Sequence, residues 1–173
     1  METNVEIIKV YRQEVPELRF IGKKYGDSDR VNGMFGKHWG DWHQNGWFDI
    51  IDKSININMN TVFEDGNAAI GLMRDKEGVF EYWIGKFMPK ETNVPDGFAY
   101  QDFPKGALGV CWLYGKEDFL YKNEGKCAKK LEESGNKFKC VDGSVWCFER
   151  YTDSRFEADE KGNVILDLCF FCE

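Results

Sequence analysis

The stretch VPDGFAYQDFPKGALGVCWLYG, residues 94–115, decides the fold, because its pattern predicts turn, strand, turn and strand in succession and then runs into a helix. A Pro-Asp-Gly turn opens the stretch, and a second turn at Pro104 separates strands expected at residues 99–103 and 105–114. Consecutive strands joined by such short turns pair in antiparallel fashion. The stretch therefore predicts an α+β fold with an antiparallel sheet.

A similar stretch, FIGKKYG at residues 20–26, also runs into a predicted helix. Tyr25 precedes Tyr114 by 89 residues, and the apolar run at residues 82–88 precedes the run at 166–172 by 84 residues. The two offsets agree within the length of a loop, and each is about half of the 173 residues. A solenoid needs three or more copies, so the pattern favours two modules folded together.

We therefore expect a single domain, residues 1–173, with modules at about residues 5–88 and 97–173 related by a pseudo-twofold axis. Each module has the order β-β-α-β-β. The expected strands are residues 5–11, 17–25, 67–74, 79–88, 99–103, 105–114, 144–151 and 164–172, and the expected helices run through Trp39 and Trp42 and from Glu117 to Ser134. The sequence predicts an antiparallel sheet of about eight strands with two main helices. The seam of such a duplicated sheet is a natural place for a cleft.

Charge and hydropathy exclude several classes of function. The net charge of −7 and the pI near 5.0 argue against direct nucleic-acid binding, which needs a basic surface. The N-terminal stretch has no basic region, and the chain has no run of roughly 18 apolar residues that would span a membrane. We expect a cytoplasmic protein without membrane contact.

The six cysteines are expected to be reduced thiols, because several lie within apolar strand patterns where cysteine acts as a small hydrophobe. Cys169 and Cys172 have metal-ligand spacing, but neighbours at i and i+3 on a strand point to opposite faces. His38 and His43 are not spaced i, i+4. The sequence contains no dinucleotide fingerprint or phosphate loop. No metal and no cofactor are expected.

Short motifs in a fixed order carry a family resemblance. They are YWIG at residues 82–85, VPDGF at 94–98, FPKG at 103–106, WLYG at 112–115, FERY at 148–151 followed by Arg155-Phe156, and LDLCFF at 166–171. In this order and spacing the chain resembles, nearly end to end, the gyrase-inhibitor-like (GyrI-like) proteins, also found as the effector-binding domain of AraC- and MerR-type bacterial regulators.

The resemblance implies two β-α-β-β modules about a pseudo-twofold axis, with small apolar or cationic aromatic molecules bound in a cleft at the module junction. Some free-standing members are reported to hydrolyse strained cyclopropane compounds, and the founding member binds DNA gyrase. Two departures matter. The sequence leaves no room for a helix-turn-helix before Val5, so we expect a free-standing domain rather than a complete regulator. Cys169 and Phe170 stand where the family often has an aromatic residue followed by isoleucine and proline.

Glu149 is the main candidate for the site. Strand alternation places Cys147, Glu149 and Tyr151 on one face, so this carboxylate has apolar and aromatic neighbours, and family members carry an acidic residue at the matching position. Such a group attracts a cation when ionised, or donates a proton when burial raises its pKa. The alternative is a surface glutamate paired with Arg150 or Arg155.

Aromatic residues make up 16% of the chain, more than a core of this size requires. The expected ligand-binding residues are Glu149, Trp112, Tyr114, Trp39, Trp42, Tyr82, Trp83 and Tyr151, although a tryptophan on a sheet is more often core. Asp167 and Glu81 are secondary candidates that could instead turn to solvent.

The preferred function is a small-molecule-binding domain with an aromatic, acidic cleft. Two alternatives remain open: a hydrolase of strained cyclopropane-type toxins with Glu149 as the catalytic residue, and a gyrase-interacting inhibitor. A separate regulator is a further candidate partner.

Overall fold

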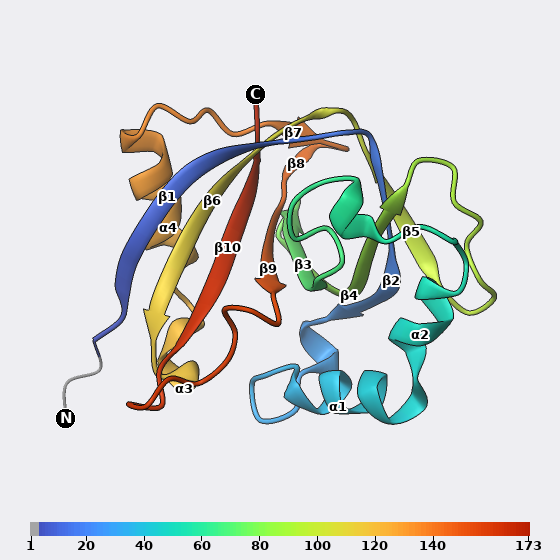
Figure 1. Ribbon diagram of the computed structural model, residues 1–173, viewed down its shortest axis with the longest axis horizontal. Coiled ribbons are helices and arrows are strands. Elements are labelled where there is room, and N and C mark those ends of the chain that lie inside the picture. The colour runs from blue at the N-terminus through green and yellow to red at the C-terminus, as the bar shows by residue number, and fades with distance from the viewer. Residues whose placement is uncertain (1–3) are drawn as a thin grey trace. The chain divides into compact units, whose positions relative to one another are not determined.

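The computed structural model describes residues 4–173, and the first three residues of the N-terminal stretch discussed above lie outside it. The chain divides into two compact units. The first unit consists of the chain up to Val15 together with Gly106–Glu173, and the second unit is Pro16–Lys105. Each unit contains four long antiparallel strands and its own helices (Figure 1).

The sheet of the first unit has the strand order β1-β6-β10-β9. Its elements are β1 (Glu6–Val15), β6 (Gly106–Gly115), α3 (Glu117–Leu120), α4 (Glu124–Glu133), β7 (Cys140–Val141), β8 (Ser144–Val145), β9 (Cys147–Tyr151) and β10 (Val164–Cys172). The short strands β7 and β8 pair only with each other among the described residues. The helix α4 packs against β1, β6 and β10.

The sheet of the second unit has the strand order β3-β4-β2-β5. Its elements are β2 (Leu18–Gly26), η1 (Asp27–Asp29), α1 (Gly36–Asn45), α2 (Trp47–Asp52), η2 (Met59–Thr61), β3 (Ala69–Lys76), β4 (Val79–Pro89) and β5 (Ala99–Phe103). The β3–β4 hairpin turns at Glu77 and Gly78, both with positive φ. The α+β class and the antiparallel pairing of the eight main strands are thus confirmed in residues 4–173.

The first strand of each sequence half joins the sheet of the other half. β1 pairs along β6, and β5 pairs along β2. The two compact units therefore differ from the expected modules at residues 5–88 and 97–173. Those modules group β1 with β2 and β5 with β6, whereas the compact units group β1 with β6 and β5 with β2. The sequence offsets predict the repeated order of the elements. They do not predict which strands pair, because strand pairing depends on contacts between distant parts of the chain.

Two predicted helices differ in extent from the observed ones. The helix expected from Glu117 to Ser134 is interrupted, because Tyr121 has extended backbone and Lys122 has a φ of 70°, which no helix accommodates. The helix through Trp39 and Trp42 ends at Gly46, whose left-handed φ of 65° closes α1 before α2 begins.

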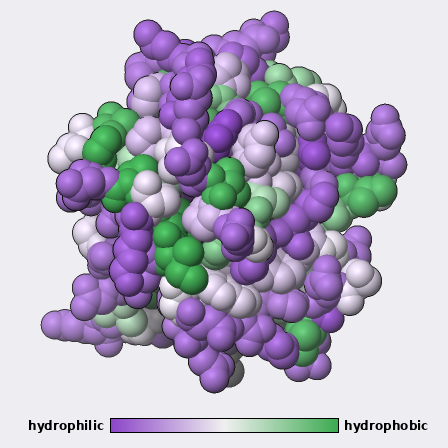
Figure 2. Space-filling view, turned by 90° about the vertical axis from the view of Figure 1, so that its right-hand side faces the viewer, coloured by the Kyte–Doolittle hydropathy of each residue, from purple (hydrophilic) through white to green (hydrophobic). Residues whose placement is uncertain are grey.

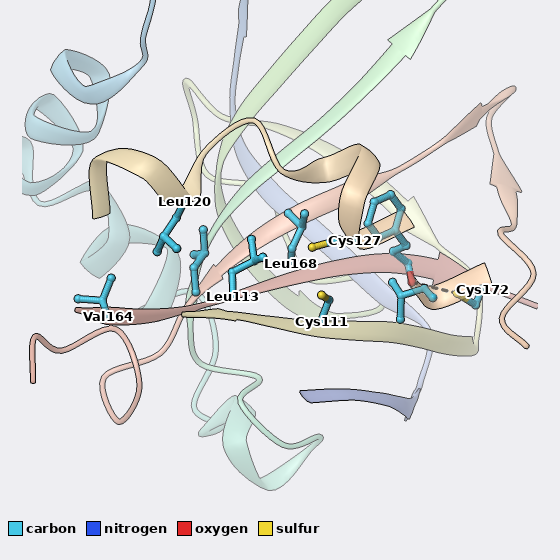
Figure 3. Close-up of a cluster of buried hydrophobic side chains, with 10 residues drawn as sticks. Cys111, Leu113, Leu120, Cys127, Val164, Leu168 and Cys172 are labelled. Carbon is cyan, nitrogen blue, oxygen red and sulfur yellow. Dashed lines mark hydrogen bonds between the residues drawn. The ribbon is translucent and has the colours of Figure 1, made fainter. Parts of the chain in front are cut away.

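The core of the first unit lies between its sheet and the helices α3 and α4. Figure 3 shows Leu120 of α3 and Cys127 of α4 pointing at side chains of β6 and β10, among them Cys111, Leu113 and Leu168. Alternation therefore defines two faces of this sheet. We call the face that carries Cys111, Leu113 and Leu168 the helix-bearing face, and the other side the opposite face.

Tyr25 and Tyr114 occupy matching places in the two similar sequence stretches, but their side chains are not equivalent. The hydroxyl of Tyr25 accepts a hydrogen bond from Trp42 of α1, so Tyr25 faces the helices of its unit. Tyr114 alternates with Leu113 and lies on the opposite face of its own sheet, where it donates to Asp159 at 2.5 Å. A shift of one residue reverses the face of every side chain. The similarity of the two stretches thus predicts the order of strand and helix, but not structurally equivalent residues.

Figure 2 shows a surface dominated by polar side chains, with apolar ones in small separate patches. Within residues 4–173, no helix is long and apolar enough to cross a bilayer. All six cysteine thiols are free. The same residues contain no group of three or more His, Cys, Asp or Glu side chains arranged to hold a metal ion.

Candidate functional site

Glu149 lies on the helix-bearing face of the first unit. It pairs with Leu168 of β10, a member of the core cluster beneath α4, and residues paired across strands share a face. Its neighbours on that face, Cys147 and Tyr151, pack against the same cluster. Only 6% of Glu149 is exposed. The carboxylate is therefore a buried group and not a surface glutamate at a sheet edge.

The surroundings of Glu149 form an acidic region with phenol groups. Burial raises the pKa of Tyr121, a nearby Tyr151 hydroxyl opposes this shift, and the carboxylates of Glu149 and Glu117 add to it. Burial likewise raises the pKa of the Cys147 thiol, with Glu124 and Glu149 contributing in the same direction. Burial is the main cause of both shifts, and the carboxylates that add to them, Glu149 among them, attract a cation when ionised.

Tyr151 contributes an aromatic wall beside Glu149. Its ring meets that of Phe156 edge-on, with centroids 4.8 Å apart. Both rings pack against the core cluster but remain partly exposed. A carboxylate beside half-exposed aromatic rings has the two components that recognise an organic cation, a negative charge and polarisable ring faces.

In the second unit, aromatic side chains of α1 lie on the strands β2 and β4. Trp39 donates from Nε1 to the Tyr82 hydroxyl at 3.0 Å, and Phe35 stacks on the Tyr82 ring at 4.3 Å. Trp42 donates to Tyr25 at 3.0 Å and is fully buried. Trp42 therefore serves the core of this unit, whereas Trp39 is partly exposed.

Three of the expected ligand-binding residues lie on the other side of their sheets. Trp112 and Tyr114 alternate with Cys111 and Leu113, so the structure places them on the opposite face of the first unit and not beside Glu149. Trp83 alternates with Tyr82 and therefore faces away from α1 in the second unit. Each prediction named the right strand, but only the observed packing identifies which face carries the helices.

The secondary carboxylates do not turn to solvent. Asp167 is fully buried and accepts from Arg150 Nε at 2.8 Å and from Arg155 Nε at 2.9 Å. Glu81 accepts from Arg74 Nε and pairs with Lys24 Nζ at 3.3 Å. Burial opposes ionisation of Glu81, but the hydrogen bond and charge of Arg74, aided by Lys24, hold its pKa below the ordinary value.

Two of the hollows formed by residues 4–173 are lined by residues other than the predicted site residues. One, of about 220 Å³, lies in the first unit between residues 10–12 of β1 and residues 134–136 after α4. The other, of about 690 Å³, lies in the second unit beside Asp49 and residues 52–56.

The arginine pair on Asp167 was missed by the sequence argument, which considered Arg150 or Arg155 only as a partner of Glu149 in the alternative of a surface glutamate. Alternation alone gives the signal that finds it. Glu149 and Arg150 are adjacent and must face opposite ways, while Arg150 pairs across the ladder with Asp167.

Comparison with solved structures reveals the same fold in other proteins. SAV2435 bound to tetraphenylphosphonium matches with a TM-score of 0.63 at 14% identity, over 96% of this chain and 94% of that one. A protein from Staphylococcus aureus MU50 described under bacterial transcription regulation matches with a TM-score of 0.60 at 13% identity, over 95% and 98% of the two chains. The C-terminal domain of EcmrR matches with a TM-score of 0.55 at 13% identity, over 95% and 97%.

No protein-family model matches the sequence, and no curated protein matches it either. The structural likenesses show the fold: the chain has the gyrase-inhibitor-like fold that its sequence resemblance predicted.

Proposed function

We propose that this protein binds small apolar or cationic aromatic molecules and that Glu149 supplies the negative charge that meets a cationic ligand. The observation that carries the proposal is the burial of this carboxylate to 6% exposure beside the phenols of Tyr121 and Tyr151. The shared fold with a protein that was solved with tetraphenylphosphonium supports the same class of ligand.

A large organic cation suits these surroundings for a physical reason. Its charge is spread over aromatic groups, so it loses less hydration on burial than a compact ammonium does. The ring of Tyr151 offers a face or edge for contact, and Glu149 offers the counter-charge.

Tetraphenylphosphonium and neutral triphenylphosphine oxide are the probes, with binding measured by calorimetry on the intact protein. Glu149→Gln keeps the size of the side chain and removes its charge. We expect the affinity for the cation to fall about tenfold or more, equivalent to roughly 1.4 kcal/mol, and the affinity for the oxide to stay within about twofold. Glu132→Gln, at an exposed position of α4, removes the same charge elsewhere and serves as the matched control.

Circular dichroism and thermal melting check that Glu149→Gln is folded. If the parent protein binds neither probe at millimolar concentration, the ligand class is wrong. If it binds the cation and Glu149→Gln binds equally well, the class stands and the role of Glu149 is rejected.

A further inference from the structure

One cross-strand row runs over the opposite face of the first unit. Lys9 of β1 pairs with Trp112 of β6, Trp112 pairs with Asp167 of β10, and Asp167 pairs with Arg150 of β9. Paired residues share a face, so all four side chains project from the side of the sheet that α3 and α4 do not cover. Arg155, from the segment after β9, joins them by its contact with Asp167.

Positive charge is in excess in this row. Arg150 and Arg155 converge on Asp167, with Arg155 Nη2 only 2.5 Å from Oδ2. Arg150 also donates to Gln13 at 2.8 Å and to the Tyr11 hydroxyl at 3.2 Å, so its Nε and both terminal nitrogens have partners. Its role is to hold Asp167 and β1 in place. Counting Lys9, three cations face a single carboxylate.

Lys9 is the member of the row whose charge has no ion-pair partner among the described residues. Lys9 is exposed and forms no ion pair with any described carboxylate, yet its Nζ lies 4.6 Å from the Trp112 ring and 4.9 Å from the Tyr11 ring. The Arg155 guanidinium lies 4.5 Å from the same Trp112 ring. Burial raises the pKa of Tyr11, and the charge of Arg150 and a hydrogen bond from Trp112 oppose this shift, so the buried indole N–H is directed at the Tyr11 hydroxyl.

Two cations beside one aromatic ring define the complementary ligand. Like charges held close together repel, so a negative group between them gains energy from both. The partly exposed Trp112 ring accepts a flat apolar body. The whole chain carries a net charge of −7, so this row differs in sign from the protein as a whole.

We propose that this face of the first unit is a second binding site, specific for a small aromatic anion such as an aryl carboxylate. Lys9 and Arg155 meet the negative group, and the partly exposed Trp112 contacts the ring. Arg150 and Asp167 position Arg155 and do not themselves touch the ligand. The site is independent of the function proposed above, which concerns the helix-bearing face and a ligand of opposite charge.

The test compares three probes with one aromatic body: 2-naphthoate, neutral 2-naphthamide and cationic 2-naphthylmethylammonium. Binding is followed by calorimetry and by the indole N–H signals in ¹H–¹⁵N spectra, the Trp112 signal being assigned by its loss in Trp112→Phe. We expect naphthoate to bind most tightly and to shift the Trp112 indole signal. Lys9→Gln should weaken naphthoate about fivefold or more, because the lysine is a principal charge contact.

Lys129→Gln, at an exposed position of α4, removes the same charge and provides the matched control. We expect it to leave naphthoate affinity within about twofold. Equal binding of naphthoate and naphthamide, or equal effects of Lys9→Gln and Lys129→Gln, would overturn the second site.

Tetraphenylphosphonium separates the two proposals. If it binds the parent protein and is weakened by Glu149→Gln while naphthoate does not bind, only the second site fails. If naphthoate binds as expected while tetraphenylphosphonium does not, only the function proposed for the helix-bearing face fails.

Discussion

Replacing Asp167 with asparagine removes a negative charge that two arginines of the first unit share. Asp167 is fully buried and Arg150 is 1% exposed, while the Arg155 side chain is 13% exposed. The carboxylate accepts at 2.8 Å, 2.9 Å and 2.5 Å from these two guanidiniums. Asparagine keeps the shape but offers a single acceptor oxygen and an amide group whose N–H atoms face the arginine donors.

The expected loss is set by the buried cation that remains. Removing one partner of a buried ion pair costs about 3–5 kcal/mol, because the other charge stays in a poorly solvated place. For a domain of this size each kcal/mol corresponds to roughly 2–4 °C in melting temperature. We therefore expect Asp167→Asn to unfold about 6–20 °C below the parent in a reversible thermal scan, with urea unfolding as a second measure of the free energy.

A double substitution tests the physical reason. Asp167→Leu combined with Arg150→Met removes both charges and fills the space with apolar atoms, so its loss should be smaller than the sum of the two single losses. A loss below about 1 kcal/mol for Asp167→Asn, or strict additivity in the double variant, would refute the view that Arg150 depends on this carboxylate.

Three further outcomes follow from the packing. Gly85→Ala should lower the free energy of unfolding by about 3 kcal/mol or more, because its Cβ would lie 2.1 Å from the Ile21 carbonyl oxygen. Gly40→Ala in α1 places a Cβ with no atom within 4 Å and should raise the free energy of unfolding by roughly 0.5–1 kcal/mol, and urea unfolding midpoints measure both changes. Burial raises the pKa of Tyr121, so stability should fall as the pH rises past the ordinary tyrosine value of about 10, and Tyr121→Phe should flatten that fall between roughly pH 9 and 11. In the native protein a thiol reagent should label exposed Cys140 rapidly and the half-buried Cys147, whose pKa is raised by burial, far more slowly, while all six thiols react after unfolding.

The sequence predicts the order of elements well because local patterns decide it. The turns around Gly78 and Pro104 and the strand predicted at residues 105–114 correspond to β3–β4, β5 and β6 as observed. Strand partners are non-local, so the pairing of β1 with β6 and of β5 with β2 could not be read from spacing. The helix break at Lys122 was also not predicted, because a lysine with positive φ has no sequence signature.

The candidate site shows the same division. Alternation places Cys147, Glu149 and Tyr151 on one face, and the core cluster confirms that Cys147 and Tyr151 pack together beneath the helices. The sequence could not say which face of β6 meets α4, because both faces carry apolar side chains. Trp112 and Tyr114 were therefore grouped with Glu149, from which the sheet separates them.

Glu149 and Arg150 are adjacent on β9, and this adjacency gives the first unit two faces of opposite charge. On the helix-bearing side burial raises the pKa values of Tyr121 and Cys147, and the charge of Glu149 adds to both shifts. On the other side the arginine joins Arg155 and Lys9, and Asp167 compensates only part of the charge of these three cations. Ionic screening in water acts over about 8 Å, so ligands approaching the two faces experience different signs. The charge of a small aromatic molecule, more than its shape, would then decide which face it binds.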